Sequence, residues 1–200
     1  MSLTKISNNS LSAISTLPAS IPTGALTLLS TQTASSSASI EFTSGIDSTY
    51  DSYVFKCIDI HPQTDNVDFT FNFSSDGGSN YNVTKTTTAF DTYHFENDSA
   101  TALEYLTLQD LAQSTSNQIL IDAIGNGSDE NNIGIINLYN PSSETFVKHF
   151  TAIGNRYYYG DATAQHFVAG YCNTTSAVDA IKFQMSSGNF DGIIKMYGVS

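Results

Sequence analysis

Hydrophobic and polar residues alternate with a period of two over residues 66–74. The apolar positions are Val67, Phe69, Phe71 and Phe73, and the polar positions between them are Asp68, Thr70, Asn72 and Ser74. Because side chains alternate faces along a strand, the pattern predicts a β-strand with one buried face and one solvated face. An Asp-Gly-Gly sequence at 76–78 follows, and its glycines can supply the positive φ that a tight reversal needs. The segment therefore indicates an antiparallel hairpin.

Similar short patterns continue from about residue 25 to the end of the chain. The expected strands are 25–32, 37–43, 52–60, 66–74, 81–86, 91–96, 103–109, 117–124, 133–139, 145–153, 157–160, 164–171, 177–185 and 192–198. Loops rich in Gly, Asn, Asp, Ser and Pro separate them, and one helical turn is expected at 46–51. No long amphipathic helix separates the strands, which argues against a parallel α/β fold. The prediction is an all-β, antiparallel, jelly-roll-like sandwich over residues 25–200.

Residues 1–24 have a different composition and are treated as an N-terminal arm. They contain no aromatic residue and one charged residue, and Pro18 and Pro22 would break a helix. Apolar residues recur every three to five positions, at Leu3, Ile6, Leu11, Ile14 and Leu17. The segment is either a disordered tail or an extended arm docked on a partner chain or a sister subunit. We favour the docked arm, in which these apolar residues supply the anchoring area.

Composition narrows the classes of partner. The 200 residues suit one domain with an appendage, and only 13% of them are charged. The net charge of −12 comes from 19 acids and 7 scattered bases. A chain without a basic stripe is a poor ligand for nucleic acid or for anionic membrane. No apolar run reaches the roughly 18 residues of a membrane span, so membrane insertion is not expected.

Catalytic and metal-binding motifs are absent from the sequence. The four histidines form no ligand pair, and neither a Gly-x-Ser-x-Gly elbow nor a glycine-rich phosphate loop occurs. Cys57 and Cys172 lie far apart in sequence, and we favour two buried thiols over a disulfide. The prediction is a protein that is not an enzyme and has no catalytic residue, metal or cofactor.

One cluster has the character of a binding surface, namely Arg156, Tyr157, Tyr158 and Tyr159. Tyrosine rings can stack on sugars or on protein partners while keeping a polar tip in water. In a strand, Tyr157 and Tyr159 would share one face and Tyr158 would lie on the other. The alternative to a binding role is that one of these faces is core and the other an interface.

Three segments of the chain resemble phage virion proteins. Residues 45–78 (Gly-Ile-Asp-Ser-Thr-Tyr through Phe-Asn-Phe-Ser-Ser-Asp-Gly-Gly) and residues 180–198 (Ala-Ile-Lys-Phe through Lys-Met-Tyr-Gly) are similar to virion proteins of marine tailed phages. The opening Leu-Thr-Lys-Ile-Ser-Asn-Asn-Ser-Leu-Ser-Ala-Ile at 3–14 resembles the short N-terminal arms of fibre and decoration proteins. The resemblance implies a jelly-roll-like component of the capsid surface or tail, and it brings no catalytic residues.

Three functions follow as hypotheses. The leading one is a structural virion protein, assembled in the host cytoplasm, bound to other capsid or tail proteins and homo-oligomeric, with a trimer favoured. The second is a tail-fibre module that binds a host surface glycan through residues 156–160. The third is a polysaccharide depolymerase, which would show two carboxylates facing each other in a groove.

Overall fold

The structure is a computed structural model that describes residues 26–158 and 160–199, and every regular element within them is a β-strand. The arm residues 1–24, with their predicted anchors, and Tyr159 lie outside the described residues. The strands are β1 (Thr27–Ser37), β2 (Ser39–Phe42), β3 (Ser52–Pro62), β4 (Val67–Ser74), β5 (Lys85–Phe95), β6 (Thr101–Tyr105), β7 (Gln118–Ile124), β8 (Asn132–Tyr139), β9 (Lys148–Tyr158), β10 (Ala162–Cys172), β11 (Ala180–Met185) and β12 (Phe190–Val199).

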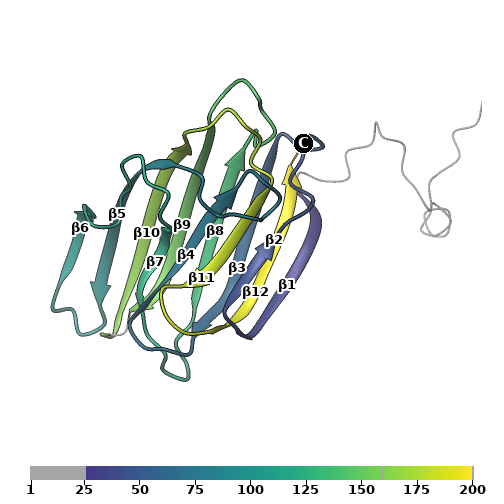
Figure 1. The fold of residues 1–200 in the computed structure, drawn as a ribbon. Coiled ribbons are helices and arrows are strands. Elements are labelled where there is room, and N and C mark those ends of the chain that lie inside the picture. The colour runs from purple at the N-terminus through teal and green to yellow at the C-terminus, as the bar shows by residue number, and fades with distance from the viewer. Residues whose placement is uncertain (1–25, 159, 200) are drawn as a thin grey trace, which may run out of the picture.

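The strands form two layers joined at one corner (Figure 1). The larger layer has the order β1-β12-β3-β8-β9-β10-β5-β6, and the smaller layer has the order β2-β11-β4-β7. Every pairing is antiparallel, and a single pair, Ile124 of β7 with Tyr158 of β9, connects the layers. The prediction of an all-β antiparallel sandwich is confirmed.

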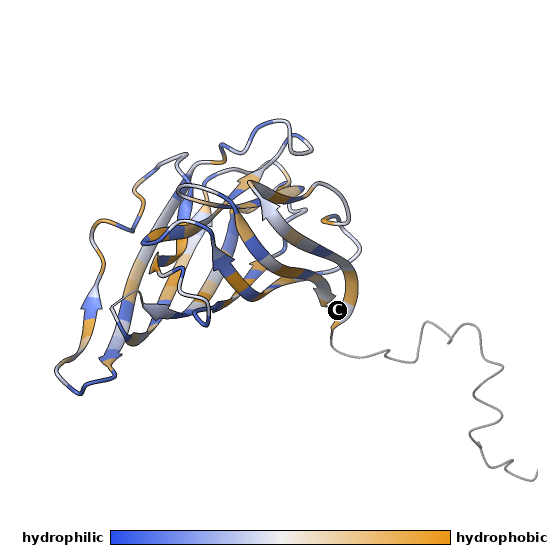
Figure 2. Ribbon diagram, turned by 90° about the horizontal axis from the view of Figure 1, so that it is seen from below, coloured by the Kyte–Doolittle hydropathy of each residue, from blue (hydrophilic) through white to orange (hydrophobic). Residues whose placement is uncertain are grey.

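Aromatic side chains fill the space between the layers. Phe69 of β4 stacks on Phe183 of β11 with ring centroids 5.9 Å apart, and it meets Phe190 of β12 edge to face at 5.4 Å. All three rings are fully buried. Along many strands, hydrophobic and hydrophilic residues alternate, as Figure 2 shows. The period of two therefore places one set of side chains in the core.

The expectation that β4 has a solvated face is wrong. Thr70, Asn72 and Ser74 are as buried as the phenylalanines between them. The loop before β7 satisfies part of this polar side, because Asn72 Nδ2 donates to Thr115 O and to Asn117 Oδ1 at 3.0 Å. Polar residues can therefore occupy a strand's outer face without being solvated, provided that their hydrogen bonds are made.

Several predicted boundaries are also corrected. Gly77 and Gly78 do have positive φ, but β4 pairs with β7 and β11 rather than with β5, so the turn leads to the other layer and forms no hairpin. The expected strands 81–86 and 91–96 are replaced by one strand, β5, which pairs with β10 along its whole length. Thr86 and Thr88 on its outer face bridge the gap between the two expected strands. Residues 46–51 form a turn without a helix.

Two glycines let β7 lie directly against the larger layer. A Cβ on Gly154 of β9 would lie 2.4 Å from Ile121 Cγ1 and 2.8 Å from the carbonyl oxygen of Leu120. On Gly134 of β8, a Cβ would lie 3.0 Å from Leu120 Cδ2. The close approach explains why Gly154 continues β9 and does not end it, which merges the expected strands 145–153 and 157–160.

Gly154→Ala is expected to lower the free energy of unfolding by about 1–3 kcal/mol, because the added methyl group must displace the β7 backbone. Gly134→Ala is the matched control and should cost less, since it meets only the end of a flexible leucine side chain. Urea unfolding of the two variants tests this order. Equal stability of both variants and the wild type would contradict the close packing described here.

Candidate functional site

The end of β9 carries the residues of the predicted binding cluster on both of its faces. Arg156 and Tyr158 point to the inner face of the larger layer and line a cavity there. Tyr157 points to the outer face, where its hydroxyl group donates to Asp161 Oδ1 at 3.2 Å. The predicted placement of Tyr157 and Tyr158 on opposite faces is therefore confirmed. Arg156 and Tyr157 also line a second hollow, of about 460 Å³, at the same end of the layer, and Tyr158 does not line that one.

The inner cavity has a volume of about 330 Å³ and is formed by β5, β6, β7, β9 and β10. The floor of the cavity is formed by β10, whose alanines have short side chains and lie between larger residues on β5 and β9. In the ladder, Ala164 lies between Tyr93 and Arg156, and Ala162 lies between Phe95 and Tyr158. The short alanine side chains leave space that the neighbouring rings border. We call this space the inner cavity.

Arg156 is the electrostatic centre of the inner cavity. Its Nη2 lies 3.4 Å from Asp91 Oδ2, and its Nη1 contacts Asp122 Oδ1. The side chain of His166 lies beside the same carboxylate, with Nδ1 3.6 Å from Asp122 Oδ1. Two carboxylates thus share one guanidinium group, which offsets much of the cost of burying the charge.

Burial sets the protonation state of two of these groups. It lowers the pKa of Arg156, although the Asp91 carboxylate opposes the change. It also lowers the pKa of His166 to about 4, and the positive charge of Arg156 adds to the effect. His166 is therefore neutral near pH 7 and adds no positive charge beside Arg156.

Some buried polar atoms around the inner cavity have no hydrogen-bond partner in the protein. They include the acceptor Asp91 Oδ1, the donor Arg156 Nε and the ring nitrogen His166 Nε2. Asp91 and Arg156 are only 4% and 6% exposed, so bulk water does not solvate these groups freely. These atoms lie beneath the cavity surface, and the charged residues that line the cavity itself are Asp91, Glu104, Asp122 and Arg156.

The depolymerase hypothesis expects two carboxylates across a groove. Asp91 and Asp122 both line the inner cavity, and Glu104 of β6 is a third acid there. Arg156 contacts both Asp91 and Asp122, an arrangement that favours holding a polar group in place. The enzyme alternative stays a prediction.

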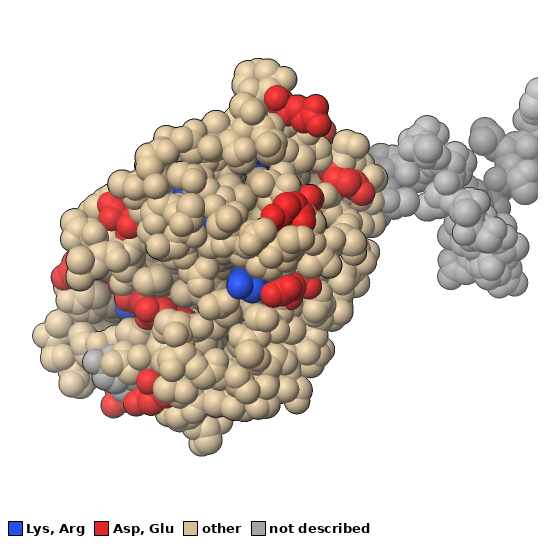
Figure 3. Space-filling view, in the orientation of Figure 1, with Lys and Arg blue, Asp and Glu red and all other residues tan. Residues whose placement is uncertain are grey.

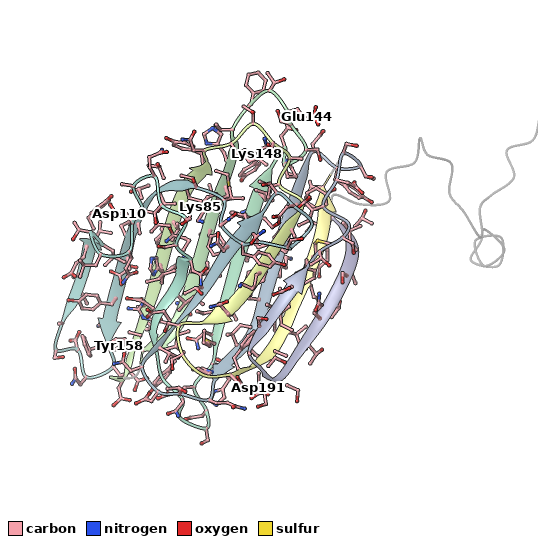
Figure 4. All side chains as sticks on the ribbon, in the orientation of Figure 1. Lys85, Asp110, Glu144, Lys148, Tyr158 and Asp191 are labelled. Carbon is pink, nitrogen blue, oxygen red and sulfur yellow. The ribbon has the colours of Figure 1, made fainter. Side chains whose placement is uncertain are left out.

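A second buried polar row lies at the opposite end of the larger layer, where Lys85 and Lys148 are labelled in Figure 4 far from Tyr158. Lys85 of β5, Cys172 of β10 and Lys148 of β9 are direct neighbours in the ladder. Lys85 Nζ donates to Asn72 Oδ1 at 2.6 Å and to Val83 O at 2.8 Å, and burial lowers its pKa to about 8. No pattern in the sequence marks these lysines as buried.

Both cysteines are free and buried, as predicted. Burial raises the pKa of Cys172 to about 12, so its thiol is neutral and unreactive near pH 7. Among the described residues, no group of three or more His, Cys, Asp or Glu side chains could hold a metal ion. In the same part of the chain, no helix is long and apolar enough to cross a membrane.

The outer face of the larger layer carries a row of hydrophobic residues that are exposed, except for the half-buried Phe167. The row crosses five neighbouring strands in register, through Ile135, Ile153, Phe167, Phe90 and Tyr105. The rings of Phe90 and Phe167 stack with centroids 4.7 Å apart, and Phe90 remains 39% exposed. We call this row the outer stripe. Elsewhere, Figure 3 shows a surface with scattered acids and few bases.

Comparison of the chain with models of known protein families, with curated proteins and with solved structures finds no match. The resemblance to virion proteins therefore stays a prediction. The site is defined by its geometry alone.

Lys85→Met is expected to change how stability depends on pH. Below about pH 8, the lysine is charged in both states and the folded state bears the full cost of burying it. Between the folded pKa of about 8 and the ordinary value of 10.5, the folded protein alone loses the proton, so this cost falls as pH rises. Relative to the variant, the wild type should therefore gain roughly 3 kcal/mol across this window.

Urea unfolding of both proteins at a series of pH values measures this difference. Stability curves that stay parallel from neutral pH to above pH 10.5 would contradict the buried position of the Lys85 ammonium group.

Proposed function

We propose that the protein is a structural component of a phage virion, docked by its N-terminal arm to the capsid or tail and displaying the β-sandwich on the particle surface. Three features support this proposal. They are the resemblance of residues 45–78 and 180–198 to virion proteins, the low share of charged residues, and the outer stripe. The outer stripe carries most weight, because it is a surface feature that a protein acting alone does not need.

The outer stripe is suited to contact with a second protein surface. Neighbouring strands are about 4.8 Å apart, so five strands place its first and last members about 19 Å from each other. Ile135, Ile153 and Tyr105 are 43%, 42% and 55% exposed, which is high for such large apolar side chains in one row. Covering such a row removes apolar area from water and stabilises an assembly.

A second copy of the same chain is the partner that the outer stripe fits best. At its β8 end the row continues to Lys56 of β3 and Lys195 of β12. At its other end, the hydroxyl group of Tyr105 donates to Asp110 Oδ2 at 2.7 Å. A two-fold axis through the middle of the row would place the basic end of one copy over the acidic end of the other. This arrangement favours a pair of chains as the unit of the homo-oligomer over the trimer expected from sequence.

Deleting residues 2–20 is expected to abolish incorporation of the protein into particles, because it removes the apolar residues that anchor the arm. The thermal unfolding of the isolated protein should change little, since the deletion leaves the whole described sandwich intact. Quantitative immunoblotting of purified particles measures incorporation. Normal incorporation of the deleted protein would rule out anchoring by the arm.

Ile153→Lys is expected to convert the dimer into a monomer, because it places a charge in the centre of the outer stripe. Thr151→Lys is the matched control, since Thr151 is exposed two residues earlier on the same face and pairs with Asn137 and Ala169, which lie outside the outer stripe. Sedimentation velocity of the three proteins at equal concentration measures the mass. A monomeric wild type, or a dimeric Ile153→Lys variant, would contradict this use of the outer stripe.

A further inference from the structure

We propose that the inner cavity is a binding site for a saccharide, with neutral sugar hydroxyl groups held by Asp91 and Arg156. The proposal concerns the chemistry of the cavity and does not depend on the virion role. It uses Arg156 and Tyr158 from the cluster that the sequence indicated and leaves out Tyr157, which does not line the cavity.

The hydrogen-bonding groups of the inner cavity select a hydroxyl group. Asp91 and Arg156 form one ion pair and both line the cavity, where a carboxylate can accept hydrogen bonds and a guanidinium group can donate them. A hydroxyl group can donate to the first and accept from the second, whereas an ammonium group can only donate and a carboxylate can only accept. Neighbouring hydroxyl groups on a sugar ring therefore match this pair of groups.

The charge of the inner cavity argues against an anionic ligand. Asp91, Asp122 and Glu104 line the cavity, against the single guanidinium group of Arg156. His166 adds no positive charge near pH 7, because burial keeps it neutral. A phosphate or an acidic sugar would meet a net negative site, while a neutral polyol would not.

The walls of the inner cavity suit the apolar side of a sugar ring. Tyr93, Phe95 and Tyr158 border the cavity above the alanine floor, and the rings of Phe95 and Tyr158 meet edge to face with centroids 6.2 Å apart. Tyr93 is held by a hydrogen bond of 3.4 Å from its hydroxyl group to Glu104 Oε1. Rings of this kind offer a large apolar surface at low entropic cost.

The size and position of the inner cavity are consistent with such a ligand. Its volume of about 330 Å³ falls at the small end of the range of roughly 300–1,000 Å³ found for small-molecule sites. Glu104 is exposed, so a ligand can reach the cavity from the β6 side. The alternative occupant is ordered water, which would satisfy the same polar atoms without the aromatic walls.

The test begins with the full chain labelled with ¹³C on its alanine methyl groups. Glucose, galactose, mannose, glucosamine and glucuronate are added in turn, and the methyl shifts are recorded. Ala123, Ala162 and Ala164 line the inner cavity, whereas Ala169 belongs to the outer face and serves as the internal control. We expect at least one neutral hexose to shift the three cavity methyl groups in a saturable way and to leave Ala169 unchanged.

Two variants then locate the contacts. Tyr158→Ala should weaken binding by about tenfold, which corresponds to about 1.4 kcal/mol of lost contact. Tyr157→Ala, its neighbour on the other face, should bind as the wild type does.

Three results would overturn the proposal. The first is the absence of any methyl shift with every neutral hexose, which would leave water as the occupant. The second is a shift confined to Ala169. The third is binding of glucosamine or glucuronate alone, because it would mean that charge and not hydroxyl pairing selects the ligand. The alanine shifts of the wild-type protein decide the matter even if Tyr158→Ala fails to fold.

Discussion

The rest of the structure depends on how closely β7 approaches β9. Among the described strands, one ladder pair, Ile124 with Tyr158, joins the smaller layer to the larger one. Elsewhere the two layers are held by side-chain packing and by polar contacts such as Arg156 with Asp122 and Lys85 with Asn72. The ladder pair forms only where β9 lacks a side chain at Gly154, because the carbonyl oxygen of Leu120 occupies the space a Cβ would need. The constraint is steric, and it fixes where the sandwich closes.

The same approach determines the electrostatics of the inner cavity. Closing β7 over β9 brings Asp122 to Arg156, which already faces Asp91 across β10. Removing a guanidinium group from water costs several kcal/mol unless partners compensate. The two carboxylates compensate the charge, but they do not fill the hydrogen-bonding capacity of every atom, since Arg156 Nε and Asp91 Oδ1 stay unpaired. A polar cavity is thus a consequence of closing this particular corner.

Sequence patterns predicted the strands better than they predicted what surrounds them. The alternation at 66–74 identified β4, and the alternation at 157–158 placed Tyr157 and Tyr158 on opposite faces. Both follow from the geometry of a single strand. The burial of Asn72 could not be predicted, because it depends on a loop more than forty positions later in the chain, where it bonds Thr115 and Asn117.

The candidate site was less predictable for the same reason. Asp91, Asp122 and Arg156 belong to three strands, and no spacing in the sequence relates them until the register of β5, β10 and β9 is known. Nor does anything local indicate that Phe90 stacks on Phe167, since the two rings are 77 positions apart and meet only through that register. A site made by residues on neighbouring strands can be predicted only when the register of those strands is known, and a single sequence does not reveal that register.

The two faces of the larger layer carry different surfaces on the same strands: the inner cavity on one face and the outer stripe on the other. On β5, Asp91 and Tyr93 face the inner cavity, while Phe90 lies in the outer stripe. On β9, Arg156 faces inward and Ile153 outward. Since side chains alternate, a substitution on one face leaves the other face's side chains in place. Assembly and ligand binding can therefore be altered separately in this protein, even though they share the backbone of β5, β9 and β10.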